Sequence, residues 1–278
     1  MKSLIKSFIP PILFKALKNL NASSNKVYKN YQDALDLCLA NRGGYSADEL
    51  VKVVVDKNLR LFSDISSNRV LGLEAFRTLA AIGLSTQGSN LNVIDFGGGG
   101  GYHYKLAKIA FGSERILKWH VVETPEMVNE AIRIKEPDLK FYDDITDAKN
   151  DLVKVDLVFS SSALQYCPDP LYFLKELVKI DAKYLFITRT PFVDSVENII
   201  AIQKSRLSSN GPGSLPEGVK DRSVFFPITY VSRSAVEGIL SQNYEIRFMT
   251  DEGSGVFNIK GSKINMNGYF CVRKGSAI

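Results

Sequence analysis

The chain has 278 residues, of which 45% are hydrophobic and 23% are charged, proportions that predict a globular protein with a large core and exclude a disordered chain. The formal net charge is +5 at pH 7 without a long basic run, so the composition does not favour nucleic-acid binding. The three cysteines are far apart and fit neither a disulfide framework nor a zinc site, which predicts reduced thiols in the cytoplasm. No cluster of metal-ligating residues is visible in the sequence, so no metal ligands are assigned.

Residues 1–20 combine lysines with Ile, Leu and Phe, as some targeting segments do. The uncharged run between Lys6 and Lys15 contains Pro10 and Pro11 and is far shorter than the ~20 apolar residues that span a bilayer. We therefore expect neither a signal peptide nor a transmembrane helix. A helix packed on the domain is the main expectation, and weak peripheral contact with an anionic membrane is the alternative.

Residues 1–88 show helical patterns without a strand pattern, and we interpret them as an N-terminal helical cap. Ser46 and Glu49 have the spacing of a capping box, which predicts a helix that runs through about Val55. A second helix is expected over residues 67–82, before Gly83.

Residues 89–278 alternate between strand-like and helix-like runs. The predicted strands cover 91–96, 119–123, 139–142, 155–160 and 184–188, and the helices between them include 106–111 and 171–180. This alternation predicts a Rossmann-like doubly wound α/β sheet that is mostly parallel, with helices on both faces. Two later strands, 244–250 and 268–273, have no helix between them and predict an antiparallel C-terminal hairpin at the sheet edge.

Five consecutive glycines follow the first predicted strand. A backbone without side chains can adopt positive φ and lets a ligand approach closely. A dinucleotide fingerprint, Gly-x-Gly-x-x-Gly, fits poorly, because Tyr102 or His103 stands where its third glycine is required. The run therefore disfavours a nicotinamide cofactor.

The pattern Asp/Glu-x-Gly-x-Gly-x-Gly of a methyltransferase loop is filled by Asp95, Gly97, Gly99 and Gly101. S-adenosylmethionine carries an ammonium and a sulfonium but no phosphate, so an acidic residue beside the loop favours this cofactor. We predict that these four residues and Gly98 bind S-adenosylmethionine.

Acidic residues end the second and third predicted strands. Glu123 is placed to accept hydrogen bonds from both ribose hydroxyls, a device that dinucleotide enzymes share. Asp143 and Asp144 follow the third strand, where one aspartate could accept the adenine amino group and Ile145 could pack on the ring. We assign Asp144 and Ile145 to the cofactor.

Several of these segments together resemble a family of class I methyltransferases associated with bacterial surface-polysaccharide loci. The resemblance covers most of the chain and is carried by 8–11, 43–45, 95–99, 119–123, 141–142, 161–166 and 188–192. It implies an S-adenosylmethionine-dependent transferase and adds Ser161 to the expected cofactor contacts. Many small-molecule methyltransferases have a histidine after the fourth strand, whereas this chain has Tyr166, so a histidine base at that point is unsupported.

Methyl transfer to a hydroxyl needs a general base, and His103 is the candidate because the other histidine, His120, lies within a strand. The alternative for His103 is a structural hydrogen bond near the cofactor. Gln165, Tyr166 and Arg189 follow the fourth and fifth strands, the edge where open α/β sheets bind ligands, and are the predicted acceptor-binding residues. Arg189 could hold an acidic sugar or a nucleotide phosphate, or form a structural salt bridge.

Residues 208–216 are rich in Ser, Gly and Pro and predict a mobile excursion over the site, within an insertion around 194–223. The sequence as a whole predicts methyl transfer to a sugar or sugar nucleotide. A catalytically silent methyltransferase-like domain that binds a biosynthetic partner is the first alternative, and a nicotinamide-dependent sugar-modifying enzyme is the second.

Overall fold

The computed structural model describes residues 26–276 except 42, 46, 64–72, 87–89, 113–115 and 253–256. Its strands are β1 (Asn90–Phe96), β2 (Ile116–Val122), β3 (Leu139–Tyr142), β4 (Leu157–Ser161), β5 (Tyr184–Val193), β6 (Ile199–Arg206), β7 (Ser223–Ser232), β8 (Tyr244–Asp251), β9 (Phe257–Ile259) and β10 (Ser262–Arg273). Its helices are α2 (Tyr31–Ala40), α3 (Asp48–Ser63), α4 (Leu73–Ser85), α5 (Tyr102–Phe111), α6 (Pro125–Ala131), α7 (Ile145–Asn150), α8 (Pro170–Lys179) and α9 (Arg233–Asn243), with short 3₁₀ helices η2 (Leu164–Tyr166) and η3 (Leu207–Ser209).

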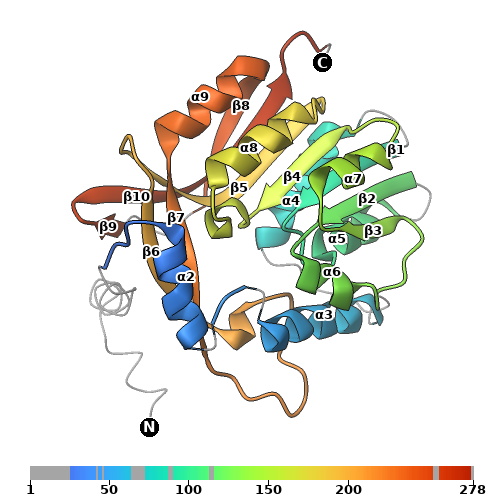
Figure 1. Ribbon diagram of the computed structural model, residues 1–278. Helices are drawn as coiled ribbons and strands as arrows, with labels where there is room; N and C mark the ends of the chain where they lie inside the picture. The colour runs from blue at the N-terminus through green and yellow to red at the C-terminus, as the bar shows by residue number, and fades with distance from the viewer. Residues whose placement is uncertain are drawn as a thin grey trace, which may run out of the picture.

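The strands form one sheet with the main order β3-β2-β1-β4-β5-β10-β8 (Figure 1). Strands β1 to β5 pair in parallel, whereas β10 is antiparallel to β5, β8 and β9. The order reverses between β1 and β4, so the carboxyl ends of these strands form the crevice in which open α/β sheets bind ligands. The predicted architecture is confirmed: a Rossmann-like doubly wound α/β sheet, mostly parallel, with an antiparallel C-terminal pair.

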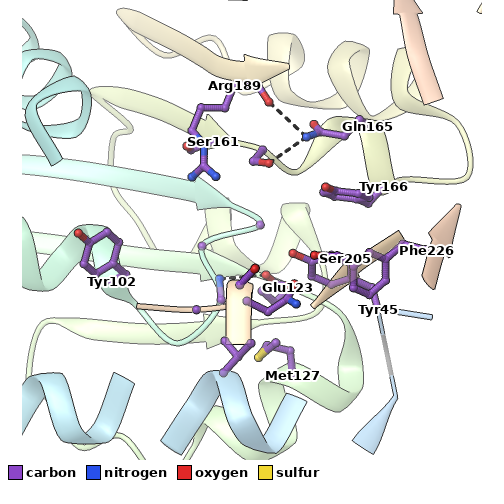
Figure 2. Close-up of a pocket in the computed structure, with 18 of the residues that line it drawn as sticks. Tyr45, Tyr102, Glu123, Met127, Ser161, Gln165, Tyr166, Arg189, Ser205 and Phe226 are labelled. Atoms are coloured by element: carbon purple, nitrogen blue, oxygen red, sulfur yellow. Dashed lines mark hydrogen bonds between the residues drawn. The ribbon is translucent and has the colours of Figure 1, made fainter. Parts of the chain in front are cut away.

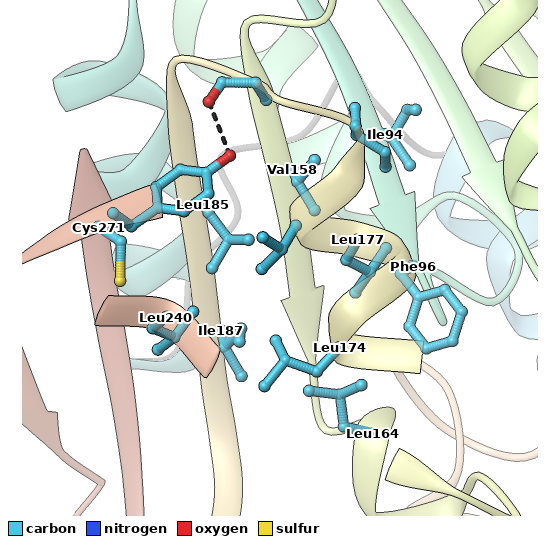
Figure 3. Close-up of a cluster of buried hydrophobic side chains, with 14 of the residues drawn as sticks. Ile94, Phe96, Val158, Leu164, Leu174, Leu177, Leu185, Ile187, Leu240 and Cys271 are labelled. Carbon is cyan, nitrogen blue, oxygen red and sulfur yellow. Dashed lines mark hydrogen bonds between the residues drawn. The ribbon is translucent and has the colours of Figure 1, made fainter. Parts of the chain in front are cut away.

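Helices cover both faces of the sheet, because the parallel strands are apolar on both sides. In β1, Leu91 and Val93 join the core under α3 to α6, whereas Ile94 and Phe96 join the core under α7 to α9 (Figure 3). Each large side chain that is buried in this way contributes about 1.5–3 kcal/mol relative to an exposed one. The two cores fix the strands whose ends carry the site.

Strands β6 and β7 form an antiparallel hairpin that the sequence reading missed. They pair from Ile199 with Tyr230 to Arg206 with Ser223, and β7 also pairs in parallel with the last residues of β5, Phe192 and Val193. Helix α2 lies beside this hairpin (Figure 1), where Gly44 N donates to Phe225 O at 2.8 Å. The expected insertion around 194–223 therefore contains a regular strand, β6, and ends where β7 begins.

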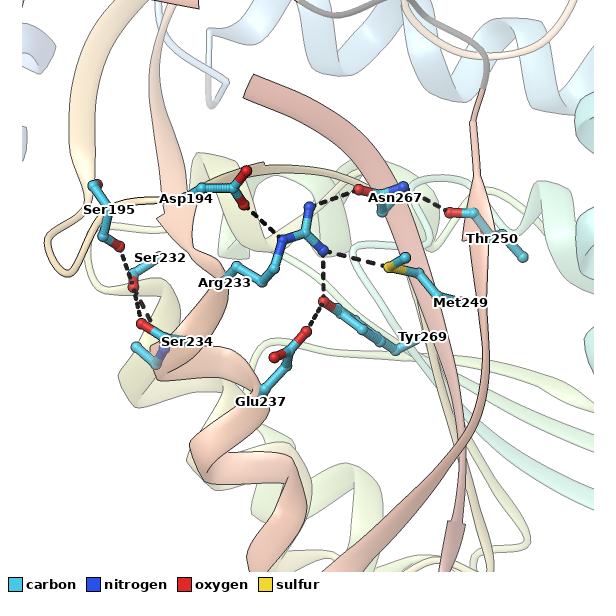
Figure 4. A network of polar contacts seen from close by, with 11 residues as sticks. Asp194, Ser195, Ser232, Arg233, Ser234, Glu237, Met249, Thr250, Asn267 and Tyr269 are labelled. Carbon is cyan, nitrogen blue, oxygen red and sulfur yellow. Dashed lines mark hydrogen bonds and ion pairs between the residues drawn. The ribbon is translucent and has the colours of Figure 1, made fainter. Parts of the chain in front are cut away.

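The N-terminus of α9 is tied to the end of β5 and to β10 by one arginine. Arg233 donates to Asp194, Asn267 and Tyr269 at 2.8–2.9 Å, and the Tyr269 hydroxyl donates in turn to Glu237 (Figure 4). Charge-assisted bonds of this kind fix orientation as well as adding energy. The network holds β5 and β10 in register next to the site.

Helices α3 and α4 pack into the sheet core, so they share one core with the α/β domain. Ser46 and the start of the helix expected at 67–82 lie outside the described residues, as does the segment 1–20. No helix among the described residues has the length and apolar character needed to cross a bilayer.

Candidate cofactor and acceptor site

Two adjoining cavities open at the carboxyl ends of the parallel strands. The large cavity, of about 850 Å³, is lined by the glycine loop, by α3 and by the β6–β7 hairpin, and the small cavity, of about 360 Å³, lies between β2, α7 and α8. Gly97, Glu123 and Ser162 line both of them. Together the cavities can take an elongated ligand that crosses the ends of β1 and β2.

The glycine loop forms the wall of the large cavity from Gly97 to Gly100. Gly97 has φ +75° and Gly99 has φ +56°, and a Cβ at Gly97 would lie 2.1 Å from the Ala163 Cβ. Side chains are therefore excluded at Gly97 by packing and strained at Gly99 by the backbone. Gly101 lines neither cavity and precedes α5, so its role is to turn the loop into the helix.

Glu123 stands where the two cavities meet. Its Oε1 accepts from Gly99 N at 2.9 Å and its Oε2 accepts from Thr124 N at 3.1 Å. Burial raises the pKa of this carboxyl, while the two backbone hydrogen bonds oppose the rise. A carboxylate has about four acceptor positions, so Glu123 can still accept two hydroxyl groups from a ligand.

The small cavity is lined by Asp143, Asp144 and Ile145, as expected for an adenine site. Asp144 also caps α7, because its Oδ1 accepts from Thr146 N at 2.7 Å and from Asp147 N at 3.1 Å. Both bonds use the same oxygen, so Oδ2 is available to a ligand amino group. Asp144 therefore caps α7, and its contact with the cofactor stays a prediction.

The prediction that Asp95 contacts the cofactor is wrong, because Asp95 lies behind the glycine loop and faces neither cavity. Its side chain is fully buried and lines neither cavity, and its Oδ2 accepts from Trp119 Nε1 at 3.0 Å and lies 2.9 Å from His103 Nδ1. It also packs beneath Gly98, where a Cβ would lie 2.4 Å from Oδ2. The geometry makes Asp95 a positioning residue for His103 and for the loop.

His103 lines the large cavity with only 8% of its surface exposed. Because Asp95 holds Nδ1, the proton of a neutral ring is fixed on Nδ1 and Nε2 is left as the acceptor. The ring edge packs on Phe159 of β4. This dyad has the chemistry of a general base that is held in one tautomer.

Two buried amide oxygens lack a hydrogen-bond partner among the described residues, and both residues line the large cavity. They are Asn58 Oδ1 and Gln165 Oε1, on side chains that are each 1% exposed. An orphaned buried acceptor costs about 1–3 kcal/mol, so a ligand with N–H or O–H donors fits here. Asn58 packs against Gly100, and sequence reading missed it because helix α3 is distant in the chain.

Lys57, one residue earlier on α3, is 2% exposed and holds the loop that follows β6. Its ammonium donates to the carbonyl oxygens of Ser208, Asn210 and Gly211 at 2.9, 2.7 and 3.2 Å. Burial lowers the pKa of Lys57. The expected excursion at 208–216 thus forms a wall of the large cavity and is fastened to the N-terminal helices.

Arg189 lies in a β-bulge of β5. The register between β5 and β10 skips from Asn267 to Tyr269, so Thr188 and Arg189 together stand opposite Gly268. Arg189 has φ +55°, which is rare for a residue with a side chain. The predicted strand, 184–188, therefore ends where the bulge begins, although β5 continues to Val193. Bulges beside active sites re-aim side chains.

Hydrogen bonds hold the bulge from both sides. Gln165 Nε2 donates to Arg189 O at 3.2 Å and to Ser162 Oγ at 2.9 Å, and Ser162 itself has φ +59° (Figure 2). Arg189 N lies 3.4 Å from Glu252 Oε1, and Glu252 pairs with Arg77 of α4. Backbone strain of this type costs about 1–3 kcal/mol per residue and persists only where its surroundings enforce it.

An aromatic wall faces Arg189 across the large cavity. Tyr45, Tyr166 and Phe226 pack with centroid separations of 4.9–5.9 Å (Figure 2), and the Tyr166 hydroxyl donates to Gln203 at 2.8 Å. Burial raises the pKa of Tyr166, so its hydroxyl stays protonated. The cavity thus brings together the three predicted acceptor residues, Gln165, Tyr166 and Arg189, and the predicted cofactor residue Ser161.

Comparisons with known proteins return distant structural likenesses only. No protein family and no curated protein matches the sequence. A SAM-dependent methyltransferase from Aquifex aeolicus is 19% identical, with 72% of this chain and 90% of that chain covered and a TM-score of 0.37. Magnesium protoporphyrin IX methyltransferase from Synechocystis is 12% identical, with 79% of this chain and 96% of that chain covered and a TM-score of 0.41. A glycopeptide N-methyltransferase is also 12% identical, with 76% of this chain and 91% of that chain covered and a TM-score of 0.42. Likeness at this level does not establish a shared activity, so function is inferred from the residues of the cavities.

Proposed function

We propose that the protein is an S-adenosylmethionine-dependent methyltransferase that acts on a small molecule, namely a sugar or sugar nucleotide used in surface-polysaccharide biosynthesis. One observation carries the proposal. Glu123 lies between a glycine-walled cavity and a second cavity lined by Asp144 and Ile145. This order suits the cofactor, with its amino-acid tail at the glycine loop, its ribose at Glu123 and its adenine in the second cavity.

The residues present fit this cofactor. Glu123 would accept the ribose hydroxyls, Asp144 the adenine amino group, and Asn58 Oδ1 the ammonium of the amino-acid tail. The last assignment replaces Asp95 and gives the orphaned oxygen a donor. When bound, the cofactor supplies an electrophilic methyl group on a positively charged sulfur.

The protein aligns the acceptor, excludes water and removes one proton. We assign proton removal to His103, with Nε2 accepting the proton of the acceptor hydroxyl and Asp95 stabilising the resulting imidazolium through Nδ1. On the side of the β6–β7 hairpin, the large cavity is lined by aromatic rings and amide groups. The rings suit the apolar faces of a sugar, and the amide groups suit its hydroxyl groups.

Incubation of the protein with labelled S-adenosylmethionine and a panel of nucleotide sugars tests the proposal. Mass detection should show one methyl gain on one acceptor class, and at a subsaturating concentration of S-adenosylmethionine the gain should fall in Glu123→Ala. Tight cofactor binding without methyl gain across a broad panel would instead favour a silent domain that binds a partner.

A further inference from the structure

Arg189 differs from most arginines of the described chain in having no carboxylate partner. Arginines that pair with a carboxylate include Arg77, Arg133, Arg206, Arg222, Arg233, Arg247 and Arg273. The guanidinium of Arg189 lines the large cavity, and among the described lining residues the one carboxylate is Glu123, which already accepts two backbone N–H groups. A guanidinium in this setting is free to bind an anion.

The bulge is what presents this guanidinium. A regular strand would keep the alternation of side chains in β5, whereas the extra residue at Thr188–Arg189 turns the Arg189 side chain into the cavity (Figure 2). Gln165 and Glu252 hold the strained backbone from its two sides. Strain that is enforced by two independent elements is typical of a functional position.

The position of Arg189 relative to the cofactor residues indicates which ligand it serves. Arg189 lines the large cavity and is absent from the lining of the small cavity, where Asp144 and Ile145 lie. The guanidinium faces the aromatic wall, and Phe226 of that wall also lines the large cavity alone (Figure 2). This is the part of the large cavity next to the β6–β7 hairpin.

Resting on the proposed function, we infer that Arg189 is the anchor for an anionic group of the acceptor, a carboxylate or a phosphate, so that the acceptor is a negatively charged small molecule whose ring packs on Tyr45, Tyr166 and Phe226. A planar guanidinium binds either anion through two parallel hydrogen bonds. Gln165 and Glu252 are positioning residues for this anchor.

Calorimetric titration with three probes tests the inference: glucuronic acid as the carboxylate, uridine diphosphate as the phosphate, and glucose as the neutral control. Each is titrated into protein with and without saturating S-adenosylhomocysteine. One of the two anions should bind, and glucose should bind at least about tenfold more weakly. Arg189→Gln should weaken the anion about 10- to 100-fold, the range for hydrogen bonds to charged groups, and Arg189→Lys should lie between.

Arg247→Gln is the matched control, because it removes an arginine of strand β8 that pairs with Glu245 and lines neither cavity. In that variant all affinities should stay unchanged. Equal binding of glucose and the anions, no anion binding in either state, or an unchanged anion affinity in Arg189→Gln would overturn the inference. Loss of S-adenosylhomocysteine affinity in Arg189→Gln, with anion affinity retained, would also overturn it and assign Arg189 to the carboxylate of the cofactor. Failure of the wild-type protein to bind S-adenosylhomocysteine would instead contradict the proposed function. The probe titrations in the absence of S-adenosylhomocysteine would still show whether Arg189 binds an anion.

Discussion

Removal of the Glu123 carboxylate tests the cofactor site at its centre. The two oxygens accept from Gly99 N and Thr124 N at 2.9 and 3.1 Å, which leaves one further acceptor position on each for a ribose hydroxyl. Hydrogen bonds to a charged group contribute about 1.5–3 kcal/mol. Glu123→Ala should therefore weaken S-adenosylhomocysteine binding by about 1.5–3 kcal/mol, or roughly 10- to 100-fold.

Isothermal titration calorimetry at neutral pH measures this change, with Glu126→Ala as the control. Glu126 is exposed, lies in the first turn of α6 and lines neither cavity, so its removal should leave the dissociation constant unchanged. Circular dichroism confirms that both variants are folded. An unchanged dissociation constant in folded Glu123→Ala would refute the assignment.

The same titration has a predicted pH dependence. Burial raises the pKa of Glu123 above the ordinary value of 4.5, and the ionised form is the one that accepts from both hydroxyls. Affinity should thus be full above this raised pKa and should fall as the pH is lowered through it, starting at a higher pH than for an ordinary glutamate. Glu123→Gln should flatten this profile. A profile that is equally steep in both proteins would assign the dependence to another group.

Three further changes probe the loop, the base and the wall of the cavity. Gly99→Val should abolish cofactor binding measured by calorimetry, whereas Gly99→Ala should lower the free energy of unfolding by about 1–2 kcal/mol, the cost of a left-handed residue with a side chain. Retained binding in a folded Gly99→Val protein would show that the glycines serve packing and not the ligand. His103→Ala should cut methyl transfer by ~10²–10⁴ while cofactor affinity stays within a few-fold, and His103→Gln, which keeps a donor for Asp95, should lose as much activity; full activity in both would exclude this base. Lys57→Met should destabilise the protein by about 1–3 kcal/mol in thermal unfolding, because the carbonyls of residues 208–211 lose their donor, and should speed proteolysis within that loop; equal cleavage rates would show that Lys57 does not hold it.

The sequence was most informative where one short segment forms a strand of the sheet and also lines the candidate site. The β1 strand and the glycines after it predicted the first crossover, and the acids at 123 and 144 follow strands whose ends meet at one edge. Periodicity placed most of the parallel strands within a few residues. It missed β6 and β7, although Ile199 to Ile202 is a strongly β-forming run, because the turn-rich stretch after it suggested a mobile insertion.

Contacts between segments distant in the chain were beyond the sequence. The Asp95 carboxylate was expected to face the cofactor because its spacing fits a loop motif, but spacing does not show that Trp119 and His103 bind it beneath the loop. The helix predicted after Ser46 ended at about Val55, so sequence reasoning assigned no role to Lys57, and only the fold brings three carbonyls to it. The bulge at Arg189 likewise depends on the register of β10.

Calorimetric titration of the wild-type protein with S-adenosylmethionine, S-adenosylhomocysteine and NAD is the most direct test of the proposed activity. The geometry of Glu123, Asn58 and the glycine loop predicts that S-adenosylmethionine and S-adenosylhomocysteine each bind at one site. No binding of NAD should be detected, because the loop lacks the third glycine of the fingerprint that binds a pyrophosphate. Binding of NAD without binding of S-adenosylmethionine would contradict the account and indicate a nicotinamide-dependent enzyme.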